Sequence, residues 1–223
     1  MEKMASQQGV GKEESNLTKT AYLTLKDKIV KGELKQGEVI SIAAMSRALN
    51  ISRTPLANAC QKLERDRLVT IIPKQGVVIN SVSIVEAREV YELRAAVETY
   101  AARKVFDYAT GDDIAMLEQS FQRQTEYVEK AVPEKFMKED LWFHKYLLSI
   151  RKNSQFLYVL DHVTDKSYLL GLESCRSKGR LLKSLEEHRA IIDALVAHDR
   201  DAFVAAVERN ILNGLMNLTG DHL

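Results

Sequence analysis

The stretch from Ser52 to Ile79, SRTPLANACQKLERDRLVTIIPKQGVVI, contains one helix followed by two short strands, and this order decides the fold of the surrounding residues. Thr54 is a good N-cap, and Pro55 suits the first helical position because its missing N–H has no acceptor there. These two residues therefore predict where the helix begins. Its apolar residues recur at helical spacing and form a buried side: Leu56, Cys60, Leu63 and Leu68.

Two β-prone runs follow this helix, at residues 69–72 and 77–79. The segment Pro73-Lys74-Gln75-Gly76 joins them, and its glycine supplies the positive φ that a tight hairpin needs. The sequence therefore predicts a helix followed by a two-stranded wing.

Upstream of this stretch, two more helices are expected. Leu17, Ala21, Leu25 and Ile29 recur at helical spacing up to Lys31-Gly32. Ser41 can cap a short helix. With three helices and a wing, residues 17–80 are predicted to form a winged helix-turn-helix. Residues 1–16 contain almost no apolar side chain and are predicted to be a flexible arm.

Downstream, residues 81–223 have helical periodicity throughout. The first of six predicted helices has an apolar stripe, and the later ones are marked by capping residues, an N-terminal proline or apolar spacing. The stripe is Val90, Leu93, Val97, Ala101 and Val105, and the markers are Thr110, Pro133, Asn153, the segment 181–196 and Asp199. Long helices with short connections predict an antiparallel all-helical bundle, so the chain as a whole is mainly α.

Composition restricts the class of protein. The chain has 223 residues, of which 45% are hydrophobic and 28% charged, as in an ordinary globular protein that can bury a core. Residues 1–80 have a net charge of +5 and residues 81–223 a net charge of −4. No segment has the length of a membrane span or the apolar core of a signal peptide, so we expect a cytoplasmic protein. Cys60 and Cys175 lack metal-knuckle spacing, which fits a reducing compartment.

The basic first part suggests contact with DNA. A helix-turn-helix places the N-terminal residues of its second helix against base edges in the major groove. Arg53 has the planar fork that pairs with guanine or phosphate, and Lys74 at the wing tip would reach the phosphate backbone. The alternative is a solvated basic surface without a DNA role. The full set of candidate DNA-binding residues is Arg47, Ser52, Arg53, Thr54, Asn58, Lys74 and Gly76.

Three polar residues are predicted on inward faces of the bundle. Asp140 and His144 are four residues apart on an apolar helix face, which brings their Cβ atoms to ~5–6 Å, and His188 lies between apolar neighbours on another helix. Buried polar groups without partners cost ~1–3 kcal/mol each. A shared metal ion would satisfy all three, and so would a hydrogen-bonded polar cluster without metal.

The sequence from Leu34 to Gly76 resembles the DNA-binding domain of the bacterial GntR family of transcription regulators. The remainder resembles the FCD effector domain of its FadR-like subfamily. The matching features are the segments ELRAAVE (92–98), DLWFH (140–144) and EHRAIIDALVAHD (187–199), together with the turn at Asn153. The resemblance implies a dimeric, ligand-controlled repressor or activator of a metabolic operon that binds an operator in double-stranded DNA and senses a small organic acid.

The resemblance also implies a metal site in which one Asp and three His hold a divalent ion such as zinc, nickel or manganese. Asp140, His144 and His188 occupy three of these positions, and Asn210 stands where the fourth ligand should be His. Arg94 matches a position that faces the effector, where it could hold a carboxylate. The other interpretation of Arg94 is an i,i+4 pair with Glu98.

Two departures from the family pattern concern DNA binding. The family usually has a second Arg on the recognition helix where this chain has Ala57, and often a basic residue where it has Ala43. Losing a bidentate Arg removes ~1–3 kcal/mol of base discrimination, so the operator should differ or the affinity should be lower. A protein-binding module without operator affinity is one alternative function. A metal-dependent hydrolase is another, although it lacks a recognisable motif for a general base.

Overall fold

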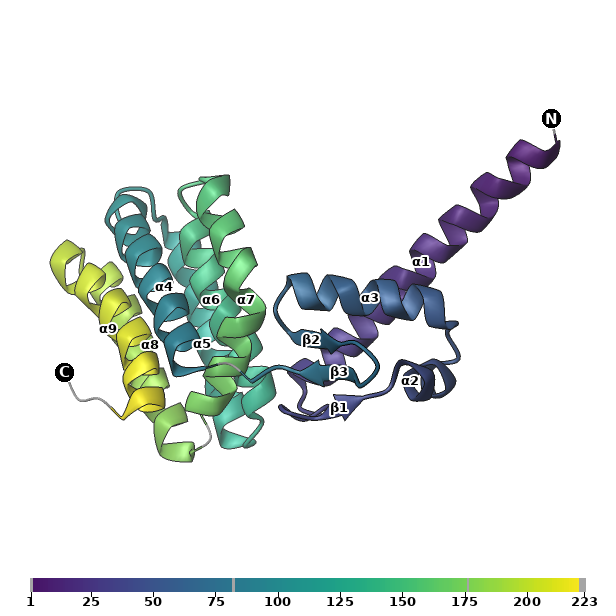
Figure 1. The fold of residues 1–223 in the computed structure, drawn as a ribbon. Coiled ribbons are helices and arrows are strands. Elements are labelled where there is room, and N and C mark those ends of the chain that lie inside the picture. The colour runs from purple at the N-terminus through teal and green to yellow at the C-terminus, as the bar shows by residue number, and fades with distance from the viewer. Residues whose placement is uncertain (1, 82, 176, 221–223) are drawn as a thin grey trace. The chain divides into compact units, whose positions relative to one another are not determined.

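The computed structural model describes residues 2–81, 83–175 and 177–220, with the side chains from residue 16 onward (Figure 1). The chain divides into two compact units, residues 1–81 and 82–223. The division falls one residue after the boundary that the sequence predicts. Each unit is described separately below.

The first unit is a winged helix-turn-helix, as the sequence predicts (Figure 1). Its sheet is antiparallel with the strand order β1-β3-β2, and Thr70 of β2 pairs with Val78 of β3. The strand β1 was not predicted, because two residues are too short to produce an alternating pattern. The elements are α1 (Glu2–Val30), β1 (Val39–Ile40), α2 (Ile42–Leu49), α3 (Arg53–Arg65), β2 (Val69–Ile72) and β3 (Gly76–Ile79).

The N-terminal helix is longer than predicted. A single helix α1 runs from Glu2, so the segment predicted as a flexible arm at residues 1–16 is helical from residue 2; residue 1 lies outside the described residues. The stretch contains Glu, Lys, Met, Ala and Gln, which favour helix, and each residue added to an existing helix gains one backbone hydrogen bond. The prediction relied on the lack of apolar residues, which indicates weak packing rather than the absence of helix.

Helix α3 begins earlier than predicted. Its N-cap is Ser52 and not Thr54, and its first helical residue is Arg53. The first intrahelical bond runs from the Leu56 N–H to the Ser52 carbonyl at 3.4 Å, so Pro55 lies at a position whose N–H has no helical acceptor. Pro55 is therefore the third residue of the helix, whereas the sequence predicts it to be the first. The buried side of α3 is Pro55, Leu56, Ala59, Cys60 and Leu63, and α1 packs against this helix.

The wing turn depends on two residues with positive φ. Lys74 has φ 65° and Gly76 has φ 139°, and the Gln75 N–H donates to the Ile72 carbonyl at 3.1 Å. A Cβ atom on Gly76 would lie only 2.7 Å from the carbonyl oxygen of Ile40 in β1. Glycine is therefore required at position 76 both for its backbone conformation and for the approach of β1.

The second unit is a bundle of six helices over its described residues, as predicted (Figure 1). Thr110 and Asp113 form a capping box at α5, and the side chains of Asn153 and Asp199 accept hydrogen bonds at the starts of α7 and α9. The helices are α4 (Ile84–Val105), α5 (Gly111–Glu129), α6 (Pro133–Ser149), α7 (Ser154–Ser174), α8 (Lys178–Val196) and α9 (Arg200–Thr219).

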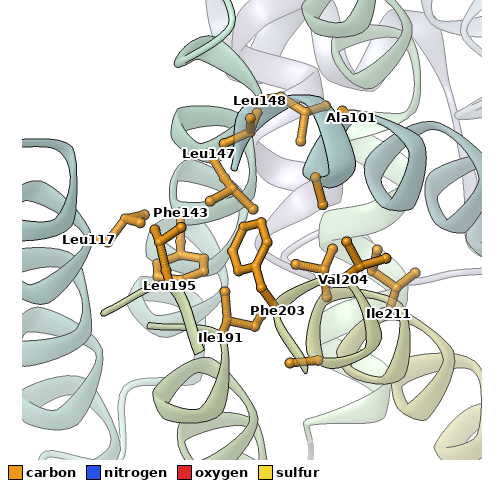
Figure 2. Close-up of a cluster of buried hydrophobic side chains, with 14 of the residues drawn as sticks. Ala101, Leu117, Phe143, Leu147, Leu148, Ile191, Leu195, Phe203, Val204 and Ile211 are labelled. Atoms are coloured by element: carbon orange, nitrogen blue, oxygen red, sulfur yellow. The ribbon is translucent and has the colours of Figure 1, made fainter. Parts of the chain in front are cut away.

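An apolar core lies between these helices (Figure 2). Burying a large side chain of this kind contributes about 1.5–3 kcal/mol. None of the helices in the described part of the chain combines the length and apolar character that a membrane span requires. The fully buried side chains of the core include Leu117, Phe143, Leu147, Leu148, Ile191, Ile192 and Phe203.

The predicted apolar stripe of α4 is partly wrong. Leu93 is 41% exposed and Val97 is only half-buried, whereas Arg94 and Glu98 are buried. The helix is rotated from the orientation that apolar spacing alone suggests, because these two charged residues pair with each other and with other helices inside the bundle. Arg94 and Glu98 of α4 therefore lie inside the bundle, where Glu98 also contacts His144 of α6.

Candidate functional site

The N-terminal end of α3 is an exposed polar surface. Ser52, Arg53 and Thr54 lie at its first turn, and Asn58 lies one turn later. All four side chains are exposed and form no hydrogen bond with any residue that the structure describes. A helix N-terminus has exposed N–H groups and a partial positive charge, so these side chains and the helix dipole favour an anion at the same place.

The other predicted DNA-binding residues lie on α2 and the wing. Arg47 is exposed on α2, with its Nε donating to the Ala43 carbonyl at 3.4 Å, and Lys74 is exposed at the wing tip. Gly76 is half-buried beside β1. The close approach of the Ile40 carbonyl explains why this position requires a glycine. Its position supports the shape of the wing and offers no side chain for contact.

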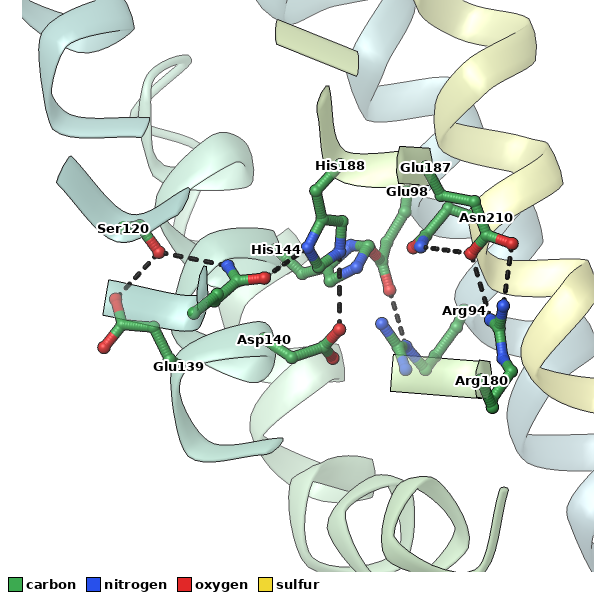
Figure 3. A network of polar contacts seen from close by, with 11 residues as sticks. Arg94, Glu98, Ser120, Glu139, Asp140, His144, Arg180, Glu187, His188 and Asn210 are labelled. Carbon is green, nitrogen blue, oxygen red and sulfur yellow. Dashed lines mark hydrogen bonds and ion pairs between the residues drawn. The ribbon is translucent and has the colours of Figure 1, made fainter. Parts of the chain in front are cut away.

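The three polar residues predicted on inward faces meet inside the bundle (Figure 3). Asp140 and His144 come from α6 and His188 from α8, and all three are buried. One ligand atom of each lies within 4.8 Å of the others, and His188 Nε2 is 3.3 Å from Asp140 Oδ1. The helical spacing therefore produces one cluster.

Glu98 fixes the ring of His144. Its Oε2 is 2.6 Å from His144 Nδ1, and its Oε1 accepts from Arg94 Nε at 2.7 Å. Burial raises the pKa of Glu98, but Arg94 and His144 outweigh this effect and hold the pKa at about 2. An ionised carboxylate only accepts, so Nδ1 of His144 bears a proton, and Nε2 is the ring nitrogen that could bind a metal. The sequence predicted the Arg94–Glu98 pair as one alternative but gave no sign of the contact with His144.

His188 has one satisfied and one unsatisfied nitrogen. Its Nδ1 is 2.5 Å from Gln124 Oε1, and its ring stacks on Phe143 at 4.5 Å between centroids. Nε2 is buried and has no hydrogen-bond partner among the described residues. Burial and the neighbouring His144 lower the pKa of His188 well below its usual value, so the ring is neutral. A buried imidazole lone pair without a donor fits a cation.

Asp140 completes the set of ligand atoms. Burial raises its pKa, and His144 and Arg94 oppose that rise. A divalent-metal site commonly has carboxylate and imidazole ligands, and this cluster offers one carboxylate and two imidazole nitrogens. Each imidazole is also held by a hydrogen bond at its other nitrogen, as is usual for histidines that bind metal. The residues present therefore fit a divalent metal ion such as zinc, nickel or manganese.

A cavity of about 30 Å³ adjoins this cluster. One water requires roughly 10–15 Å³, so the cavity has room for only a few small groups. Arg94 lines the cavity, and its Nη1 and Nη2 make no hydrogen bond within the described part of the chain. Among the other lining residues are Asp140, His144, Cys175, Arg180 and Asn210.

Asn210 lies beside the cluster but is already engaged by its amide nitrogen. Nδ2 donates to Glu187 Oε2 at 3.0 Å, and Arg180 binds the same carboxylate through two nitrogens at 2.8 and 3.0 Å. The amide oxygen of Asn210 is not used in this contact. Cys175 is a protonated thiol, since burial raises its pKa to about 12.

Several residues of the site could not be found from the sequence. Ser120 and Gln124 are buried polar residues of α5, and Glu187 is a buried polar residue of α8. The only available signal was helical spacing, since Ser120 and Gln124 are four residues apart. That spacing does not identify a partner on another helix.

Comparisons with known proteins agree with this architecture. Residues 17–79 match the model of the bacterial regulatory proteins of the gntR family, and residues 89–213 match the FCD domain. The chain is 27% identical over 186 residues to the uncharacterized HTH-type transcriptional regulator YdhC of Bacillus subtilis (strain 168), covering 81% of each chain. It is 25% identical over 193 residues to the HTH-type transcriptional repressor RspR of Escherichia coli (strain K12), covering 85% of this chain and 83% of the other.

A solved structure shows the same fold. It is described as a putative transcriptional regulator GntR from Rhodococcus sp. RHA1, with a TM-score of 0.79 and 23% identity over 94% of this chain and 100% of that one. The two family matches together cover most of this chain, and they assign its two units to DNA binding and to an FCD domain. The chain therefore belongs to the gntR family of bacterial regulatory proteins, in the FadR-like subfamily with a C-terminal FCD domain, and is a DNA-binding transcription regulator rather than an enzyme.

Proposed function

We propose that this regulator binds its operator as a homodimer and that a small carboxylate, held at a divalent metal in the second unit, controls its affinity for DNA. One observation above all supports control by a bound ligand. His188 Nε2 is buried, forms no hydrogen bond with the described residues, and lies 3.3 Å from Oδ1 of Asp140, which lines the cavity. An unsatisfied buried nitrogen costs about 1–3 kcal/mol, which binding at this place would recover.

On the DNA side, Arg53 is proposed to read a base edge and Ser52 and Thr54 to contact phosphate. The three side chains are exposed at a helix N-terminus, where a phosphate oxygen is favoured. Arg47, Asn58 and Lys74 are also exposed and are proposed as further contacts. A single head offers few base contacts, so two heads on a pseudo-palindrome would supply the specificity that one lacks.

On the ligand side, Asp140, His144 and His188 would hold the metal, with the Asn210 amide oxygen as a candidate fourth ligand. The ion would supply the positive charge that attracts a carboxylate. Glu98 and Gln124 hold the two imidazoles with their Nε2 atoms available. An amide oxygen is a weaker ligand for zinc or nickel than imidazole, and harder ions tolerate it better.

Arg94 is proposed as the second partner of the carboxylate. Its Nε is held by Glu98, and its two terminal nitrogens, beside the cavity, make no hydrogen bond with the residues that the structure describes. The limited volume favours a small acid. Two relatives are named gluconate operon transcriptional repressors, at 19% and 20% identity, and an organic acid effector for this chain is consistent with those names.

Calorimetry on the full chain tests the ligand side. The protein is titrated with zinc, nickel and manganese, and the metal-loaded protein is then titrated with a panel of small carboxylic acids. We expect metal binding at one site per chain, and acid binding that weakens in Arg94→Lys because a lysine cannot form two parallel N–H bonds. Arg209→Lys, at an exposed position of α9, is the control. Acid binding that is the same in wild type and Arg94→Lys would remove Arg94 from the effector site.

A further inference from the structure

A chain of hydrogen bonds leads from His188 toward the surface of the α5–α6 pair (Figure 3). His188 Nδ1 contacts Gln124 Oε1 at 2.5 Å, and Gln124 Nε2 donates to Ser120 Oγ at 3.3 Å. Ser120 Oγ in turn donates to Glu139 Oε1 at 2.7 Å, and Arg123 Nη2 donates to the same oxygen at 2.8 Å. Ser120, Gln124 and His188 are completely buried, whereas the Arg123 side chain is 39% exposed. We call Glu139, Ser120 and Gln124 the relay.

The direction of every bond in the relay follows from its charged end. The Glu139 carboxylate can only accept, so the Ser120 hydroxyl donates to it, and a hydrogen bond to a charged acceptor is about twice as strong as a neutral one. The Ser120 oxygen is then left as an acceptor and must receive the Gln124 N–H. This places the Gln124 carbonyl oxygen toward His188, whose Nδ1 must therefore bear the proton.

The two histidines of the cluster differ in how their tautomers are fixed. His144 faces the Glu98 carboxylate, which accepts in every orientation. His188 faces a neutral amide, which would present an N–H if it turned over. With the amide reversed, His188 would carry its proton on Nε2 and could donate it to Asp140 Oδ1, now 3.3 Å away. That arrangement is a self-satisfied polar cluster without a lone pair for a metal.

We propose that Glu139, acting through Ser120 and Gln124, holds His188 in the tautomer that binds metal and prevents the self-satisfied arrangement. Ser120 and Gln124 are thus positioning residues that decide between the two states of the cluster. The inference rests on the proposed metal site for its consequence, while the tautomer itself exists in the metal-free protein.

The first test removes the Ser120 hydroxyl. Ser120→Ala deletes the acceptor that orients Gln124, so the metal-free variant should contain His188 with its proton on Nε2, visible in the nitrogen-15 shifts of the ring. Zinc affinity measured by calorimetry should fall about tenfold, as expected for loss of a supporting contact around a metal ligand. The matched control is Ser167→Ala, because Ser167 is another buried serine and its hydroxyl has no hydrogen-bond partner in the described residues.

The second test restores the tautomer by a different route. An ionised Glu at position 124 can only accept, so Gln124→Glu in its charged form fixes the proton on Nδ1 without help from Ser120. The double variant Ser120→Ala/Gln124→Glu should therefore recover zinc affinity and the wild-type ring spectrum. Loss of packing at position 120 would not be repaired in this way, so recovery separates positioning from a structural defect.

The results distinguish this inference from the proposed function. A Ser120→Ala protein with the wild-type ring spectrum and zinc affinity would overturn the relay, as would a double variant that recovers neither. A wild type that binds no zinc would contradict the metal site. The ring spectra of the metal-free proteins would still decide whether the relay sets the tautomer.

Discussion

Arg94 and Glu98 form an ion pair one helical turn apart on α4, and both side chains are buried. Glu98 also accepts from His144, so it is hydrogen-bonded to both Arg94 and His144. Removing one member of a buried pair leaves the other charge without compensation, which is far more costly than losing an exposed pair. Glu98 therefore contributes to the stability of the bundle as well as to the polar cluster.

Glu98→Gln should lower the free energy of unfolding by about 3 kcal/mol, because Arg94 would remain buried and charged beside a neutral amide. The measurement is urea unfolding of the metal-free protein. The control is Glu126→Gln, which removes an i,i+4 partner of Lys130 on the exposed surface of α5 and should cost about 0.5 kcal/mol. Equal losses in the two variants would mean that the Arg94–Glu98 pair behaves as a solvated one.

Asn210→His should strengthen zinc and nickel binding, because it supplies an imidazole where the chain now has an amide beside the cluster. Calorimetric titration measures the affinity, and thermal unfolding with and without zinc measures the linked stabilisation. Asn213→His is the control, since Asn213 also donates to Glu187 but does not line the cavity. No gain for Asn210→His over Asn213→His would place residue 210 outside the metal site.

The sequence could identify Asp140, His144 and His188 because helical spacing places each on an inward face. It could not identify the partners of the two histidines. Glu98 lies 46 residues from His144, and Gln124 lies 64 residues from His188. Such contacts depend on how the helices pack against each other, which local spacing does not determine.

At the scale of elements, the wing depends on the close approach of β1 to Gly76. Gly76→Ala should destabilise the first unit by about 1–3 kcal/mol, because alanine disfavours a φ of 139° and its Cβ would meet the Ile40 carbonyl. Thermal unfolding measures the loss. The control is Gly111→Ala at the first residue of α5, where a Cβ would meet open space, and it should not destabilise. Unchanged stability in Gly76→Ala would show that the turn adapts without strain.

The recognition helix and the wing should make different contributions to DNA binding. Arg53→Ala should reduce the free energy of operator binding by ~1–3 kcal/mol and relax selectivity at one base pair per half-site. Lys74→Ala should instead weaken binding to all DNA sequences alike, and should lower by about one the steepness with which log affinity falls with log salt concentration. Anisotropy titrations at several salt concentrations measure both effects, with Lys183→Ala on α8 as the control. A Lys74→Ala protein with the wild-type salt slope would remove the wing from the phosphate backbone, and an unaffected Arg53→Ala protein would contradict the docking of α3.

Element boundaries show where sequence patterns succeed and fail. The starts of α5, α7 and α9 were predicted from Thr110, Asn153 and Asp199, because a cap acts through residues next to it in the chain. The rotation of α4 was missed because its buried face contains charges whose partners lie partly on α6. The strand β1 was missed because its two residues are too few to show an alternating pattern, and its pairing with β3 joins residues that are distant in the sequence.

At the scale of the whole molecule, the account requires that the ligand site in the second unit changes the affinity of the first unit for DNA. A ligand can do this only by binding one arrangement of the dimer more tightly than another, and such coupling is typically 1–3 kcal/mol, or about 5- to 150-fold in affinity. The family match establishes the DNA-binding class of the chain.

The most direct measurement is the operator affinity of the full chain under four conditions: metal-free, zinc-loaded, and each of these with the acid that binds in calorimetry. The operator is obtained beforehand by enriching bound genomic fragments. The account predicts an affinity change of at least about fivefold on adding zinc and acid, and no change in His144→Gln or Asp140→Asn, which lose a ligand of the metal. Operator binding by the wild type that is equally tight under all four conditions would contradict the account.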